Sequence, residues 1–106
     1  MEIEKEKRKI EFWSGEKYMI LPFNEHKPDD PFAGPVEVSA TITFLADCEP
    51  ARPSTAWLPA RDLASGIVDW LVYFKYVKHE RQIVRLSIEK MEGRNPGVAF
   101  IMQEVE

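Results

Sequence analysis

Cysteine is nearly absent from this sequence, which holds only Cys48 among its 106 residues. A single cysteine cannot form a disulfide within the chain, so we expect the fold to depend on its hydrophobic core. No apolar run approaches the roughly 20 residues that a membrane-spanning helix needs. The charged start of the chain, MEIEKEKRK, has no apolar segment behind it, unlike a signal peptide. The sequence therefore predicts one domain over residues 1–106, located in the cytoplasm and away from membranes.

Glycine-rich motifs that hold phosphate groups are also missing. The five glycines stand apart from one another, and none belongs to a GxGxxG, GxxxxGK or GxSxG pattern. We therefore expect no nucleotide cofactor, and no other cofactor is indicated. Positive charge does not dominate either, because 14 Lys and Arg stand against 18 Asp and Glu, the net charge is −4 and both signs are scattered along the chain. Since phosphate neutralisation needs a basic patch, we expect no nucleic acid partner.

Cys48 is a candidate nucleophile, for which His26 or His79 would have to act as the base. Its neighbours in the sequence, Asp47 and Glu49, are both acidic. A reactive cysteine needs cationic neighbours that favour the thiolate, and two carboxylates do the opposite. We therefore expect Cys48 to be chemically ordinary and predict no catalytic residue.

The segment NEHKPDDPF brings Glu25, His26, Asp29 and Asp30 within six positions. Carboxylates and an imidazole can hold a divalent metal, and calcium or magnesium would suit this set better than zinc. The spacing matches no metal-binding motif, however, and Asp and Pro are common in turns. We predict a loop without a metal. A small-ligand or metal site built on His26, Asp29 and Asp30 is the alternative.

Hydrophobic and polar residues alternate strictly in VEVSATITFLA, residues 36–46. This period of two predicts a strand with one face packed on a core. Two shorter strands are expected before it, over 8–13 and 18–23, with a proline-rich loop over 24–35. The end of the chain predicts a hairpin in which QIVRLSIEKM and VAFIMQEV are joined by EGRNPG. Its first strand is expected to bury Val84, Leu86 and Ile88.

Residues 60–78 fit either a helix or a strand. As a helix the segment gathers apolar side chains on one side at spacings of three and four: Leu63, Ile67, Trp70, Leu71, Phe74 and Val77. As a strand it would align β-branched and aromatic side chains on one face. Its length, the preceding Pro59 and the order of its charges, acidic early and basic late, favour the helix. Gly66 disfavours the helix, because glycine in a helix interior costs roughly 1 kcal/mol relative to alanine.

These elements follow the order β-β-β-α-β-β. We expect an α+β fold in which an antiparallel sheet of about five strands is covered on one face by one helix. The predicted core consists of Ile42, Phe44, Leu63, Ile67, Trp70, Phe74, Leu86 and Phe100.

A second apolar stripe would lie on the other side of such a helix. It consists of Val68, Val72 and Tyr76, with Tyr73 beside it. A helix that lies on one sheet needs only one apolar stripe. The second stripe therefore predicts self-association, such as a homodimer, or contact with a protein partner. The alternative is that the long loops fold over this stripe and bury it within the monomer.

The connection DCEPARPSTAWLPARDL, residues 47–63, is longer than a route from strand to helix requires. Arg52, Trp57 and Arg61 within it are candidates for partner recognition, because arginine and tryptophan are frequent in binding hot spots. The alternative is that Trp57 covers the end of the core while the arginines pair with nearby carboxylates.

The function that these features favour is a non-enzymatic protein-interaction module, such as an inhibitor, an immunity-type protein or an accessory subunit. One alternative is a small ligand- or metal-binding protein or enzyme that uses the loop at 24–35. Another is a structural subunit of a larger assembly.

Overall fold

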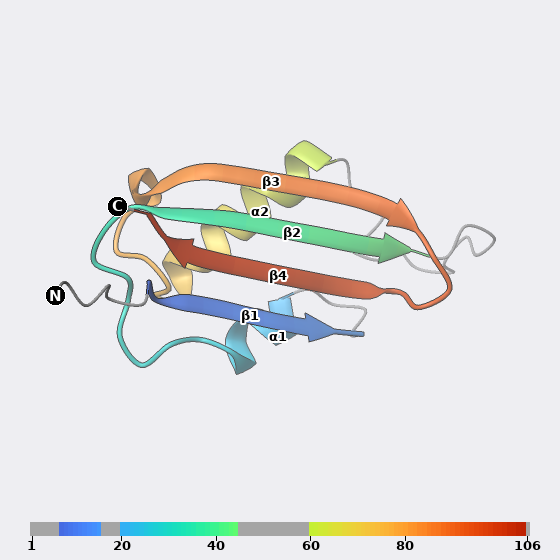
Figure 1. Cartoon of the computed structure of the whole chain (residues 1–106), viewed down its shortest axis with the longest axis horizontal. Coiled ribbons are helices and arrows are strands. Elements are labelled where there is room, and N and C mark those ends of the chain that lie inside the picture. Colours follow the sequence, from blue (N-terminus) through green and yellow to red (C-terminus); the bar gives the residue numbers. More distant parts are fainter. Residues whose placement is uncertain (1–6, 16–19, 45–59, 106) are drawn as a thin grey trace, which may run out of the picture.

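The computed structural model describes residues 7–15, 20–44 and 60–105. The elements in this part of the chain are β1 (Lys9–Ser14), α1 (Ile20–Glu25), β2 (Val36–Phe44), α2 (Ala60–Tyr73), the 3-10 helix η2 (Glu80–Gln82), β3 (Ile83–Glu92) and β4 (Gly97–Glu104). The strands form one sheet, and both α-helices lie behind it in the view of Figure 1. The protein is therefore α+β, and α2 is the one main helix of the described residues.

The strands are arranged in the order β1-β4-β2-β3, which corrects the expected hairpin at the end of the chain. β3 and β4 are consecutive in sequence, yet β2 lies between them, parallel to β3 and antiparallel to β4. β1 pairs antiparallel with β4. The parallel pair arises because α2 carries the chain back to the end of the sheet from which β2 started. The described sheet is thus four-stranded and mixed, whereas the prediction was about five antiparallel strands.

The prediction of a strand over residues 18–23 is wrong, because the chain forms the short helix α1 from Ile20 onward. Pro22 is compatible with a helix here, since it falls in the first turn, where backbone N–H groups have no acceptor within the helix. Its carbonyl accepts the backbone N–H of His26 at 2.9 Å. The helix inserts Phe23 into the core, where its side chain is fully buried.

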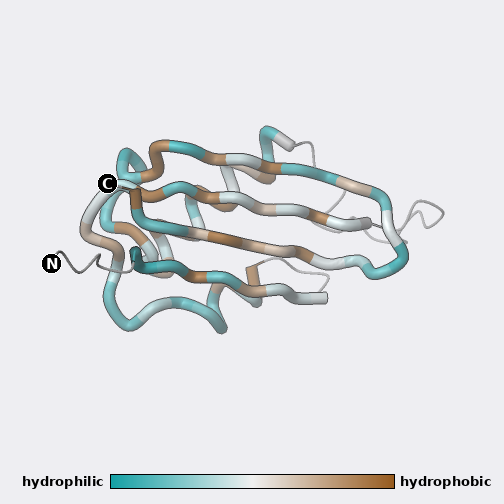
Figure 2. Tube along the Cα trace, viewed as in Figure 1, coloured by the Kyte–Doolittle hydropathy of each residue, from teal (hydrophilic) through white to brown (hydrophobic). Residues whose placement is uncertain are grey.

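The core lies between the sheet and the two helices, and β2 contributes to it as predicted. Val36, Val38, Ala40 and Ile42 are buried, whereas the residues between them are half-buried or exposed. Figure 2 shows hydrophobic and hydrophilic positions alternating along the strands in the same way.

The predicted core residues are confirmed as far as the structure describes them. Four are fully buried: Ile42, Leu63, Ile67 and Phe100. Three are partly buried and pack against these: Trp70, Phe74 and Leu86. The side chain of Phe44 lies outside the described residues.

Val84 is 58% exposed, contrary to its expected burial. The pairing of β2 with β3 shifts between Val36 and Glu37, so that these two neighbours face Ile83 and Arg85. Val84 is therefore the extra residue of a β-bulge and has no counterpart on β2. Strict alternation fails at the start of β3 and holds from Arg85 onward.

α2 ends earlier than predicted, at Tyr73. Lys75 has a positive φ of 60°, in the left-handed region. Its N–H donates to the carbonyl of Val72 at 3.1 Å, and the N–H of Tyr76 donates to the carbonyl of Leu71 at 2.8 Å. These two bonds form a Schellman motif, in which glycine usually occupies the left-handed position. The sequence has lysine there and so carries no recognisable stop signal for the helix.

The reversal at Lys75 turns Tyr76 into the core, which corrects its expected place on an exposed helical stripe. Tyr76 is fully buried. Its hydroxyl donates to the carbonyl of Phe23 at 2.6 Å, and its own carbonyl accepts the N–H of Phe32 at 2.8 Å. Tyr76 therefore ties α1 and the loop after it to the end of α2.

Alkaline pH is expected to destabilise the fold through Tyr76. Burial raises the pKa of the Tyr76 hydroxyl above the ordinary tyrosine value of about 10. The folded state thus favours the neutral hydroxyl, whose contribution is fully present below pH ~10 and is lost as the pH rises further. Urea unfolding at pH values from about 8 to about 11 would show a decreasing free energy of unfolding.

Tyr76→Phe is the control for this titration, because lysines and other groups titrate equally in both proteins. The difference in unfolding free energy between wild type and Tyr76→Phe should shrink above pH ~10. A difference that stays constant across this range would show that the Tyr76 hydroxyl is not responsible.

Candidate functional site

The loop after α1 and the loop after α2 meet at one end of the sheet through Gln82. Its Nε2 donates to the carbonyls of Phe32 at 2.7 Å and Gly34 at 3.0 Å. Its Oε1 accepts the backbone N–H groups of Lys78 at 2.8 Å and His79 at 3.0 Å. One amide side chain therefore satisfies backbone groups of both loops and fixes them against each other.

Arg8 holds the loop after α1 from the side of β1. Its guanidinium donates to the carbonyls of Asp30 and Pro31 and lies 4.3 Å from the centroid of the Phe32 ring. Its backbone N–H donates to the carboxylate of Glu104 at 2.7 Å. The cation–π contact and the hydrogen bonds together make this loop a structural part of the fold.

The residues of the alternative metal or ligand site have separate roles in the structure. The ring of His26 stacks on Phe12, with the ring centroids 4.5 Å apart and the planes within 8° of parallel. The backbone carbonyl of Asp30 accepts a hydrogen bond from the guanidinium of Arg8, and the side chain of Asp29 is exposed. Within the described ranges, no group of three or more His, Cys, Asp or Glu side chains is placed to hold a metal ion. The observed contacts account for His26 and for the loop backbone without a ligand.

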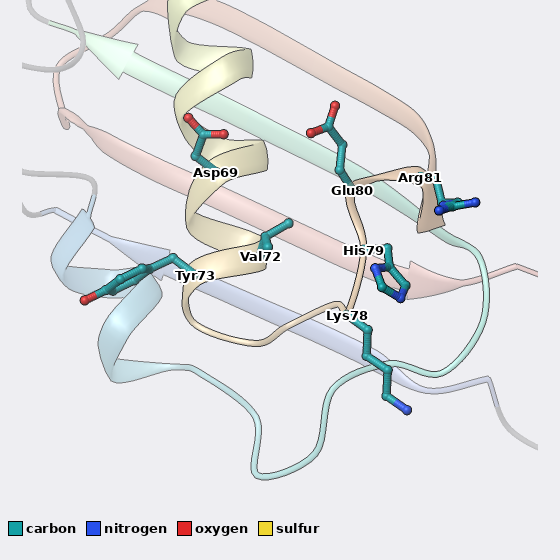
Figure 3. A pocket seen from close by; sticks show the side chains of 7 residues that line it. All are labelled: Asp69, Val72, Tyr73, Lys78, His79, Glu80 and Arg81. Atoms are coloured by element: carbon teal, nitrogen blue, oxygen red, sulfur yellow. The ribbon is translucent and has the colours of Figure 1, made fainter.

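A surface pocket of about 650 Å³ lies between α2 and the loop that follows it. It is lined by Asp69, Val72, Tyr73, Lys78, His79, Glu80 and Arg81. Figure 3 shows that Tyr73, Lys78 and Arg81 point outward in different directions and do not converge. Acid–base catalysis needs groups within hydrogen-bond reach of one substrate atom. These three side chains do not show that arrangement.

The face of the sheet opposite the two helices carries no described helix or loop (Figure 1). The strand register arranges its side chains in rows, because paired residues on neighbouring strands share a face. One row consists of Trp13, Ala99, Thr41 and Glu89. The next row consists of Glu11, Ile101, Ser39 and Ser87. We call this surface the open face.

Trp13 is a large exposed apolar side chain of the open face, 62% exposed, and Ile101 on the neighbouring strand is 39% exposed. The indole lies against the backbone of two glycines. A Cβ atom added at Gly15 or Gly97 would lie 3.3 or 3.1 Å from a carbon of the Trp13 ring. Trp13 is not among the predicted interaction residues, although the period of its strand places it on the same face as Glu11.

The predicted interaction residues of the connection before α2 are only partly described. Arg52 and Trp57 lie outside the described residues, as does Cys48. Arg61 is exposed, and its Nε lies 3.9 Å from Oδ1 of Asp62. An ion pair this long and this exposed contributes little to stability.

The predicted second stripe on α2 is shorter than expected. Val68 is half-buried, Val72 is exposed, and Tyr73 is 75% exposed. The ring of Tyr73 contacts the edge of Phe74, with centroids 5.0 Å apart. Without Tyr76, these residues form a small apolar patch on the outer side of the helix. Their role in association stays a prediction.

Comparison of the sequence with protein-family models and with curated proteins found no match. In the part of the chain that the structure describes, none of the helices has the length and apolar character needed to cross a membrane.

Proposed function

We propose that this protein is a protein-interaction module that binds its partner through the open face, with Trp13 and Ile101 as apolar anchors. The observation that carries the proposal is the exposure of the Trp13 indole on a sheet face that no described element covers. Tryptophan is among the residues most often found in binding hot spots, because it buries a large area and has few rotamers to lose. The ring lies close to the backbone of Gly15 and Gly97, where neither glycine has a side chain to displace it.

The charges around these anchors indicate the chemistry of the partner. Glu11, Glu37 and Glu89 share the open face with Lys9 and Arg85. Lys9 pairs with Glu11 at 2.9 Å, and Arg85 with Glu37 at 3.7 Å. Carboxylates are thus in excess, as they are in the whole chain with its net charge of −4. The partner that fits is a protein with an apolar pocket for the indole and basic residues around it.

The alternative of a metal- or ligand-binding protein or enzyme built on His26, Asp29 and Asp30 has less support. The ring of His26 is engaged in stacking, and Arg8 holds the backbone of the loop. These contacts stabilise the fold. They do not bring His26, Asp29 and Asp30 together around one ligand.

Replacing Trp13 by alanine is expected to weaken partner binding by about 30-fold or more, the effect of losing a hot-spot side chain of at least 2 kcal/mol. The partner would be captured from native lysate with the wild-type protein and its affinity measured for each variant. Tyr73→Ala is the matched control, because it removes another mostly exposed aromatic side chain, from the helix side of the molecule.

Both variants should unfold at the wild-type temperature, since each changes an exposed side chain. A partner that binds Trp13→Ala normally but is lost from Tyr73→Ala would contradict the proposal. That result would move the binding surface to the predicted stripe on α2.

A further inference from the structure

β3 forms one edge of the described sheet, and no described strand pairs with its outer side. Such an edge presents free N–H and C=O groups that can pair with another strand. The middle of β3 reads Arg85-Leu86-Ser87-Ile88-Glu89. In chemical terms this segment is symmetric about Ser87, with aliphatic residues on each side and opposite charges at the two ends.

Antiparallel pairing with the same strand of a second copy, about a twofold axis at Ser87, matches this symmetry. Arg85 then faces the partner's Glu89, Leu86 faces the partner's Ile88, and the two Ser87 residues face each other. Each charge pair and each aliphatic pair occurs twice because of the axis. Opposite charges directly across from each other stabilise antiparallel strands, and like charges destabilise them.

In this register the open faces of the two copies lie on the same side of the joined sheet. Arg85, Ser87 and Glu89 lie on the open face, because they pair with residues of β2 on that face. Leu86 and Ile88 lie on the helix side and pack, partly buried, against the core. The charge pairs would therefore lie on the open face while the aliphatic pairs continue the core from one copy into the other.

Neighbouring registers fit less well. A shift of one residue would place the helices of the two copies on opposite faces. An axis at Ile88 would set Arg85 against the partner's Met91, and an axis at Leu86 would set Arg85 against the partner's Ser87, so both would lose the pairs between Arg85 and Glu89. The charge pattern thus selects one register for self-pairing.

We propose that the protein forms a homodimer in which β3 pairs antiparallel with β3 of a second copy, centred on Ser87. Arg85 is available for this contact, because its side chain is 72% exposed and its ion pair with Glu37 is long, at 3.7 Å. The proposal is independent of the binding role of Trp13, since it concerns the edge of the sheet and a second copy of the chain.

Two charge reversals test this dimer. Arg85→Glu gives a chain with two carboxylates at these positions, and Glu89→Arg gives a chain with two cations. Each variant alone is expected to dimerise about tenfold more weakly or worse, because both symmetry-related pairs become repulsive. An equimolar mixture of the two restores both attractive pairs and is expected to form a heterodimer. Sedimentation velocity over a concentration series of the wild type, each variant and the mixture measures these outcomes.

Two controls keep the test decisive. Arg85→Ala removes the charge without a new repulsion at Glu37 and should also weaken the dimer. Lys9→Glu reverses a charge at the opposite edge, on β1, and should leave dimerisation unchanged, as should Trp13→Ala. A wild type that is monomeric at every concentration overturns the proposal. A mixture that stays monomeric, although both variants melt like the wild type, also overturns it.

Discussion

Replacement of Phe100 by alanine is expected to lower the free energy of unfolding by about 3–5 kcal/mol, as is typical for a fully buried phenylalanine. Phe100 is completely buried on β4, an interior strand. Its ring centroid lies 4.8 Å from that of Phe23 on α1, 5.0 Å from that of Phe12 on β1 and 6.3 Å from that of Tyr76. Alanine would leave a cavity between these rings, which come from separate elements and cannot all close over it.

Tyr73→Ala is the control for this change, because it removes an aromatic side chain that is mostly in solvent. Its effect should stay within about 0.5 kcal/mol. Urea unfolding of both variants measures the two values. A loss below about 1 kcal/mol for Phe100→Ala would contradict a core organised around this ring.

Gly97→Ala is expected to have the next largest effect, a loss of about 1–3 kcal/mol from overpacking. A Cβ at Gly97 would lie 2.5 Å from the carbonyl oxygen of Ser14 and 3.1 Å from the ring of Trp13. The oxygen belongs to the backbone of β1, so it cannot move away without opening the ladder between β1 and β4. Equilibrium unfolding followed by tryptophan fluorescence measures the loss.

Gly34→Ala provides a matched control, because no heavy atom lies within 4 Å of a Cβ added there. This variant should be close to neutral. Equal losses in the two variants would show that the contact with Ser14 does not determine the cost, because alanine by itself lowers the entropy of the unfolded chain and should stabilise.

The elements of this fold were predictable where a local pattern was long and regular. The alternation in β2 and the apolar spacing of α2 each extend over enough residues to identify the element. Short segments were less informative, because the apolar residues at 20–23 fit a strand as well as the helix α1. The end of α2 depends on a left-handed lysine, a conformation that the sequence does not signal.

The order of the strands was not predictable from local patterns. β3 and β4 look like a hairpin because a turn joins two apolar runs, but β2 takes the place between them. The position of β2 between β3 and β4 depends on contacts between residues that are far apart in sequence. The bulge at Val84 has the same origin, since only the pairing with β2 reveals it.

The open face was partly predictable. The period of β1 places Trp13 with Glu11, away from Ile10 and Phe12, and this signal was present in the sequence. That no described helix covers this face follows only from the position of α1 and α2 on the same side. The notable residues Cys48, Arg52 and Trp57 lie outside the described ranges, so their expected roles stay predictions.

The place of β4 in the sheet has a consequence for the newly made chain. β1 has β4 as its only neighbour in the described sheet, and β4 is the last of these strands to be synthesised. At about 5–20 residues per second, a ribosome needs roughly 4–17 s to proceed from Ser14 to Gly97. Throughout that interval the residues of β4 that pair with Phe12 and Trp13 have not been made, so this aromatic segment emerges before its described partner strand. Association with other chains at this stage is the main hazard that the strand order creates during biosynthesis.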